Sequence, residues 1–189
     1  MHDKLILPEA DILLHSGDFT YTGHRDEIIA FNKWQKELNF SKKIVVAGNH
    51  EFTLDLEKER EVKYRFGQYR GFDINADHKE IKSQLKDCIY LEDESVEIHG
   101  IKIYGTPWQY PFHHGGFQRR DEDREKLFDK IPENVDILLT HTPPRGHLDR
   151  MWDDKRHVGD EALAKVLKKK NVILNCFGHI HEDYGMELD

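Results

Sequence analysis

The sequence has little cysteine and no long apolar run. Its two cysteines, Cys88 and Cys176, show no C-x-x-C spacing, which argues against a disulfide framework and a thiolate zinc site. Cys176 lies inside an apolar run, and we expect it to be a small buried hydrophobic residue. No run approaches the roughly 18 apolar residues of a membrane span, and the apolar residues 5–7 are too few for a secretory leader. We therefore expect a cytoplasmic protein without a membrane partner.

Positive charge is scarce relative to negative charge. The chain has 28 Lys and Arg against 36 Asp and Glu, a formal net charge of −8. This balance disfavours long nucleic acids as partners, because their binding rests on cationic contacts to phosphates. A small anionic substrate remains compatible, since a bound metal ion reverses the sign of the local field. The sequence also lacks the G-x-S-x-G elbow of serine hydrolases and the P-loop.

The sequence does contain short strand-like apolar runs that alternate with segments of helical apolar spacing, a pattern typical of an α/β domain. We expect a single domain over residues 1–189. Ile28, Phe31, Trp34 and Leu38 recur at the spacing of an amphipathic helix. Helices are predicted over residues 25–38, 56–65, 79–86, 121–130 and 160–169. Buried, parallel-type strands are predicted over residues 10–15, 43–47, 136–140 and 172–177.

A middle stretch has a different period. Residues 88–92, 95–98 and 101–104 alternate apolar and polar side chains, with a turn at His99 and Gly100. This pattern favours antiparallel strands. Strands on both sides of such a hairpin region predict two packed sheets with helices outside them.

Polar side chains come directly after each of the four buried strands. Because the carboxyl ends of parallel strands gather ligands in α/β folds, we expect these side chains to converge on one site. Carboxylate, amide and imidazole groups suit divalent metals such as Mn, Fe or Zn. The candidate ligands are Asp18, Asn49, His141, His179 and His181, with His50 and Glu51 beside them.

Two details strengthen this prediction. His179 and His181 alternate in an extended segment, so both imidazoles face the same side. His141 precedes Pro143 and Pro144, which stiffen the loop that carries it.

The motifs GD, GNHE, a single His before TPP, and GHIH, in this order, resemble those of the calcineurin-like metallophosphoesterase superfamily. The stretches DILLHSGDFT, KIVVAGNHE, IYLEDESVEIHGIKIYGTPW, DILLTHTPPRG and FGHIHEDYG look most similar to its metallophosphoesterase-domain-containing branch. The resemblance implies a two-sheet β-sandwich flanked by helices, in four layers. It also implies a hydrolase for small phosphodiester or phosphomonoester substrates, nucleotides among them.

The resemblance implies roles for the candidate residues. Asp18 would bridge two divalent ions, and Asn49, His141 and His179 would complete the ligands of the second. His181 would bind the first ion beside Asp18. The catalytic pair would be His50, which protonates the leaving oxygen, and Glu51, which orients His50. The implied reaction is in-line attack on phosphorus by a metal-bound hydroxide.

One family motif, D-x-H, does not occur, and it supplies two ligands of the first metal. We therefore expect a domain truncated at both ends, without the first strand and the C-terminal strands. Three hypotheses stay open: a two-metal phosphoesterase, a catalytically impaired one-metal protein of the same fold that binds nucleotides or a partner, or an incomplete gene model whose D-x-H motif lies upstream of Met1.

Two further residues are candidates for substrate binding. Arg145 could reach a phosphate through paired hydrogen bonds. Trp108 opens an aromatic, glycine-rich loop that either frames the substrate or packs on the surface. The oligomeric state cannot be inferred from these patterns.

Overall fold

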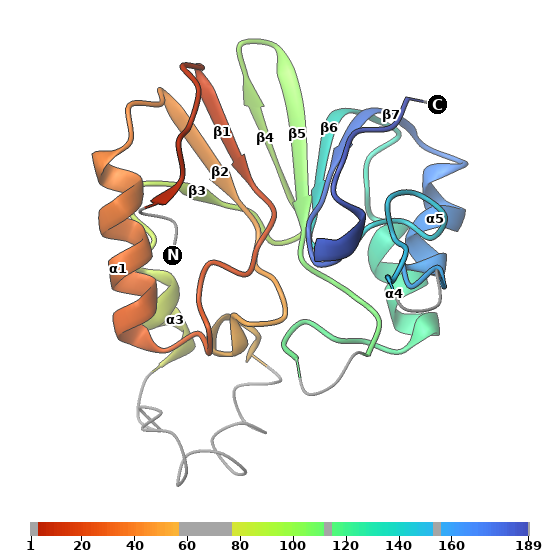
Figure 1. Cartoon of the computed structure of the whole chain (residues 1–189), viewed down its shortest axis with the longest axis horizontal. Helices are drawn as coiled ribbons and strands as arrows, with labels where there is room; N and C mark the ends of the chain where they lie inside the picture. The colour runs from red at the N-terminus through yellow and green to blue at the C-terminus, as the bar shows by residue number, and fades with distance from the viewer. Residues whose placement is uncertain (1–3, 57–76, 112–114, 153–155, 189) are drawn as a thin grey trace, which may run out of the picture.

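Two β-sheets pack face to face between pairs of helices (Figure 1). The computed structural model describes residues 4–56, 77–111, 115–152 and 156–188. The first sheet is parallel, in the order β1 (Ile12–His15), β2 (Lys42–Val45) and β3 (Ile89–Tyr90). The second sheet has the order β4 (Glu94–Ile98), β5 (Ile101–Thr106), β6 (Asn134–Thr140) and β7 (Asn171–Cys176). In it β4 and β5 are antiparallel, whereas β5, β6 and β7 run parallel.

The helices form the outer layers. The described helices are α1 (Arg25–Glu37), α3 (His78–Lys82), α4 (Asp121–Phe128) and α5 (Glu161–Leu167), with 3-10 turns η2 (Phe52–Leu54) and η3 (His181–Asp183). Helix α1 starts with a capping box, in which the His24 side chain accepts a backbone N–H and Glu27 bonds back to the His24 N–H. Among the described residues, no helix has both the length and the apolarity to cross a membrane.

Three apolar clusters hold the layers together. Side chains of β2, β5 and β6, among them Ile44, Ile103 and Leu139, fill the space between the sheets. Ile28 and Phe31 of α1 pack on the outer face of the first sheet. A third cluster joins the second sheet to α4 and α5. Burying a side chain such as Phe31 contributes roughly 1.5–3 kcal/mol, so the layers are fixed mainly by these contacts.

The two-sheet α/β arrangement predicted from the sequence is confirmed, but two strand predictions were wrong. Residues 88–92 do not form an antiparallel strand, because β3 pairs with β2 in the parallel sense. The chain between β2 and β3 includes α3, and such a crossover connection returns the chain parallel to its start. The predicted helix over residues 56–65 lies, from residue 57 on, outside the described residues.

Strand β7 is the second exception, since it is not a buried strand. It lies at an edge of its sheet, where Ile173 is 75% exposed and Leu174 is 48% exposed. Cys176 is half-buried rather than fully buried and packs against the cluster between the sheets. Apolar composition alone does not distinguish an edge strand from a central one, and the prediction failed for that reason.

Candidate metal centre

Three side chains from three loops meet at the carboxyl ends of the parallel strands. Asp18 follows β1, His141 follows β6 and His179 follows β7. One potential ligand atom from each lies within 4.8 Å of the others. A carboxylate and two imidazoles at this separation form a donor set that suits a divalent ion such as Mn, Fe or Zn.

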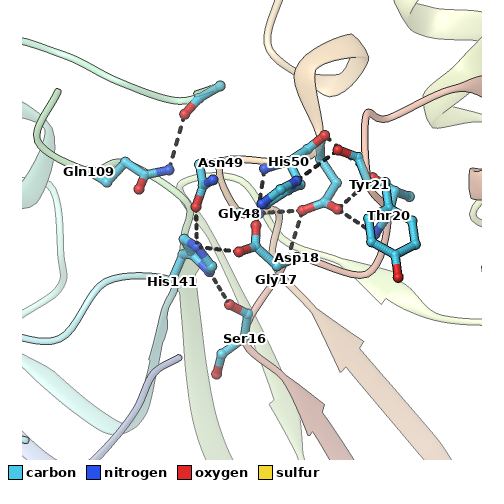
Figure 2. A network of polar contacts seen from close by, with 12 residues as sticks. Ser16, Gly17, Asp18, Thr20, Tyr21, Gly48, Asn49, His50, Gln109 and His141 are labelled. Carbon is cyan, nitrogen blue, oxygen red and sulfur yellow. Dashed lines mark hydrogen bonds and ion pairs between the residues drawn. The ribbon is translucent and has the colours of Figure 1, made fainter. Parts of the chain in front are cut away.

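The His141 ring contacts Ser16, Asn49 and Asp18 (Figure 2). Its Nδ1 is 2.6 Å from the Ser16 carbonyl oxygen, which can only accept, so Nδ1 carries a hydrogen. Its Nε2 faces the Asn49 Oδ1 at 3.0 Å and the Asp18 Oδ2 at 3.3 Å. In the neutral ring Nε2 carries a lone pair, and this lone pair faces two other acceptor atoms. Such a convergence of electron pairs requires a positive charge, either a proton on Nε2 or a cation between the three atoms.

The protonation equilibria reflect the same arrangement. Burial raises the pKa of Asp18, but the attraction of His141 and the hydrogen bonds from His141 and the His50 N–H lower it to about 2. Burial opposes protonation of His141, yet the Asp18 carboxylate raises its pKa overall. Burial, aided by the charge of His141, lowers the pKa of His179 to about 3. Asp18 is therefore ionised and His179 neutral near pH 7, the states in which both bind metal ions.

Gly48 leaves room for this group. A Cβ atom there would lie 2.3 Å from the Asp18 Oδ1 and 2.6 Å from the His141 Cε1. Any larger residue would therefore displace two of the candidate ligands.

Two of the candidate ligands have unusual backbone conformations. Asp18 has φ 55° and His179 has φ 68°, both in the left-handed region that side chains with a Cβ seldom adopt. Non-glycine residues of this kind cluster at functional sites, where the surrounding structure holds them. Both left-handed residues lie in the loops just after β1 and β7, and both belong to the cluster.

Glu51 fixes the loops that carry the ligands. Its side chain is fully buried and accepts hydrogen bonds from the backbone N–H groups of Asp18 at 2.9 Å, Thr20 at 2.8 Å and Gly48 at 2.6 Å. The Thr20 hydroxyl donates a fourth bond at 2.8 Å. Burial and the nearby Asp18 charge raise the pKa of Glu51 to about 7. Its four bonds connect the loop after β1 to the loop after β2.

A different group orients the imidazole of His50. His50 Nδ1 lies 2.7 Å from the Tyr21 carbonyl oxygen, and the His50 backbone N–H donates to the Asp18 Oδ1 at 3.0 Å (Figure 2). Since the carbonyl only accepts, Nδ1 carries a hydrogen and Nε2 is the nitrogen that exchanges a proton. The Glu51 side chain bonds to the backbone beside this ring, so its predicted role in orienting His50 stays a prediction.

His181 does not join the three-residue cluster, which contains Asp18, His141 and His179. It begins η3 and is exposed. This segment is tied to the loop after β6, since the Arg150 N–H donates to Asp183 at 2.9 Å and the Trp152 indole to the Glu182 carbonyl at 3.0 Å. His179 has φ 68°, so the segment is not regularly extended at that residue, and the shared direction of His179 and His181 stays a prediction.

The two predicted substrate contacts differ in their surroundings. Arg145 is exposed, and its guanidinium has no hydrogen bond or ion pair with any residue in the described ranges. Trp108 is already engaged: its Nε1 donates to Asp93 at 2.8 Å, and Arg119 lies 4.4 Å from its ring centre. These contacts favour the packing alternative for Trp108.

Sequence reasoning missed the groups that act through the main chain. The Ser16 and Tyr21 carbonyls, which set the hydrogen on His141 and His50, leave no signal in residue type. The steric need for Gly48 could have been suspected from its place between a strand and Asn49.

Comparison with known proteins agrees with this site. The calcineurin-like phosphoesterase family profile matches residues 1–183. The chain is 40% identical over 192 residues to human metallophosphoesterase domain-containing protein 1, with 99% of this chain and 59% of the human protein covered. It is 42% identical over 195 residues to a UPF0046 protein of Caenorhabditis elegans, with 97% and 49% covered.

A more distant relative is a probable glycerophosphodiester phosphodiesterase of Arcobacter nitrofigilis, 27% identical over 189 residues, with 96% of this chain and 60% of that protein covered. The chain thus spans between about half and three fifths of the length of these three relatives. Since the profile covers nearly every residue and the ligand-bearing loops lie where the motifs indicate, the chain belongs to the calcineurin-like phosphoesterase family.

Proposed function

We propose that this chain is a divalent-metal-dependent phosphoesterase that hydrolyses small phosphodiester or phosphomonoester substrates, including nucleotides. The observation that carries the proposal is the cluster of Asp18, His141 and His179, with the Asn49 amide oxygen directed at the same point. Family membership supports the reaction class. The name of the Arcobacter relative supports phosphodiesters as a substrate class.

The chain's own residues account for several parts of such a reaction. Asp18, Asn49, His141 and His179 would hold the metal, and His181, two residues after His179, would contribute a ligand to a second ion. A bound divalent ion would supply Lewis-acid activation of water and of a phosphoryl oxygen. No serine or cysteine nucleophile is then required.

His50 supplies the proton for the leaving oxygen. Its Nδ1–H is held by the Tyr21 carbonyl, so Nε2 is the exchangeable position and its direction is fixed. The His50 backbone is bonded to Asp18, which keeps the proton donor at a constant distance from the metal ligands. Arg145 provides an exposed guanidinium, in the loop that begins at His141, to bind a phosphate oxygen pair.

One observation favours a second candidate, a one-metal protein that binds nucleotides or a partner without hydrolysis. In the described part of the chain a single His/Asp cluster was found, and His181 is not among its members. Metal stoichiometry separates the two candidates. Two ions per chain with turnover support the phosphoesterase, and one ion with nucleotide binding but no turnover supports the alternative.

The direct test is hydrolysis of bis(p-nitrophenyl) phosphate by the purified chain with Mn²⁺. We expect turnover that depends on Mn²⁺ and is lost in Asn49→Ala. A folded protein that hydrolyses neither this ester nor its monoester with Mn²⁺, Fe²⁺ or Zn²⁺ would contradict the proposal.

A further inference from the structure

Two arginines connect the loop that carries Asn49 to the loop that carries His141. Asn49 follows β2 in the first sheet, whereas His141 follows β6 in the second. Their side chains touch at the candidate metal centre, so the relative position of the two sheets determines whether the ligands meet. A row of polar contacts beside the centre spans the same gap.

The row begins at Asp55, six positions after Asn49 and almost fully buried. Its carboxylate accepts from the Arg119 guanidinium at 3.1 and 3.2 Å and from the Phe117 N–H at 2.7 Å. Beside it, the Gly116 N–H donates to the Asn49 carbonyl oxygen at 2.8 Å. The segment 115–119 is therefore fastened to the loop after β2 at three points.

The row continues through α4. The Arg119 carbonyl oxygen accepts from the Arg124 Nη1 at 2.6 Å. The Nε of Arg124 donates to the Asp160 Oδ2 at 2.7 Å, and the two side chains are 3% and 0% exposed. A charge pair so deeply buried is seldom retained for net stability, because its desolvation offsets most of its attraction.

Asp160 completes the connection to His141. Its backbone N–H donates to the Pro143 carbonyl at 2.8 Å, and its carbonyl accepts from the Arg145 N–H at 3.0 Å. Asp160 also caps α5, since its carboxylate accepts from the Ala162 and Leu163 N–H groups. The residues directly after His141 are thus bonded to Asp160, the same residue that binds Arg124.

We propose that Asp55, Arg119, Arg124 and Asp160, the arginine bridge, are positioning residues that set the spacing between the Asn49 and His141 loops. The inference deepens the proposed function and rests on it where metal binding is concerned. The contacts described above reach the two ligand loops through the backbone at Asn49, Pro143 and Arg145. Changes to residues that orient metal ligands commonly weaken metal affinity by about 10–100-fold.

The test compares Arg124→Lys and Arg119→Gln with wild type in two measurements. The first is amide hydrogen exchange without metal, at Gly116 on one side of the bridge and at Asp160 on the other, with Val45 as the core reference. We expect exchange to accelerate at both amides more than at Val45 in each variant. The second is calorimetric Mn²⁺ binding, which we expect to weaken by at least about tenfold.

Arg25→Gln is the matched control. Arg25 also forms a forked ion pair, with Glu80 at 2.9–3.2 Å, and this pair joins α1 to α3 on the outer face of the first sheet. It should leave the exchange at Gly116 and Asp160 and the Mn²⁺ affinity within twofold of wild type. If Arg124→Lys does not fold, Arg119→Gln, whose side chain is less buried, decides the case.

The two proposals fail in different ways. Unchanged exchange at Gly116 and Asp160 in the folded bridge variants would overturn the arginine bridge, whatever the metal result. Wild-type protein that binds no Mn²⁺ would contradict the proposed function, and the metal-free exchange measurement would still decide the bridge.

Discussion

Asn49 and His141 come from different sheets, yet the Asn49 Oδ1 lies 3.0 Å from the His141 Nε2. The Ser16 carbonyl oxygen, in the loop after β1, makes a second contact between the sheets, 2.6 Å from the His141 Nδ1. A cation bound between the Asn49 and His141 atoms would favour the arrangement in which the sheets are packed together. Metal binding and the stability of the sandwich are therefore expected to be linked.

Mn²⁺ should stabilise the wild-type protein against unfolding. At about one hundred times the dissociation constant, binding to the folded state alone adds about 2.7 kcal/mol to the free energy of unfolding. His141→Ala should abolish most of this gain, because it removes the imidazole between Asp18 and Asn49. Urea denaturation with and without Mn²⁺ measures the effect. His99→Asn, in the β4–β5 turn, serves as the histidine control and should retain it.

Gly48→Ala should weaken metal binding, whereas Gly178, beside the candidate ligand His179, should tolerate the same change. The added Cβ at Gly48 would press on Asp18 and His141, whereas at Gly178 the nearest atoms lie 3.8 Å away. We expect Gly48→Ala to lower Mn²⁺ affinity by more than about tenfold and Gly178→Ala to lower it by less than about twofold. Equal affinities in the two variants would contradict the steric role assigned to Gly48.

His50→Gln should slow turnover without weakening the metal site. General acid catalysis contributes roughly 10²–10⁴-fold, and it matters most when the leaving oxygen is basic. The loss in kcat should therefore be larger for an alkyl phosphodiester than for the p-nitrophenyl ester. The experiment measures both substrates together with Mn²⁺ affinity. An equal loss on both esters would argue against His50 as the proton donor.

Asp149 gives the protein a pH-dependent contribution to stability. Burial raises the pKa of this carboxyl, but the hydrogen bond from His157 and those from the Gly146 and Gly159 N–H groups lower it overall. A lowered folded-state pKa contributes stability that is present above the unfolded value of about 4 and is lost as pH falls through the folded value. Asp149→Asn should therefore destabilise the protein more at pH 6 than at pH 3.

Denaturation midpoints at a series of pH values between 3 and 6 test this prediction. The control is Asp26→Asn, whose side chain is 83% exposed. A difference between Asp149→Asn and wild type that does not shrink toward pH 3 would show that the carboxylate charge is not responsible.

Much of the site could be predicted because its ligands lie directly after recognisable strands. The apolar runs before Asp18, Asn49 and His141 predicted parallel strands, and parallel strands bring the loops at their carboxyl ends to one edge of the sheet. The structure brings Asp18, His141 and His179 together as this reasoning requires. Residue type and position were sufficient there.

The other parts of the site and of the fold depended on contacts that residue patterns do not encode. His181 was predicted as a ligand, but the cluster found in the described residues consists of Asp18, His141 and His179, and the role of His181 stays a prediction. The pairing direction of β3 was misjudged, because an alternating pattern over a few residues is the same in parallel and antiparallel strands. Arg124 and Asp160 are far apart in the chain, and only tertiary packing shows that they form a buried pair.

The left-handed backbone at Asp18 and His179 has a consequence for engineering this protein. Glycine fits such a conformation with less strain because it lacks a Cβ, so a glycine substitution at either position would relax the local backbone. Directed evolution that selects for heat resistance alone, in medium without metal, would reward the loss of both ligands. A thermostabilised variant of this chain should therefore be selected with divalent metal present throughout.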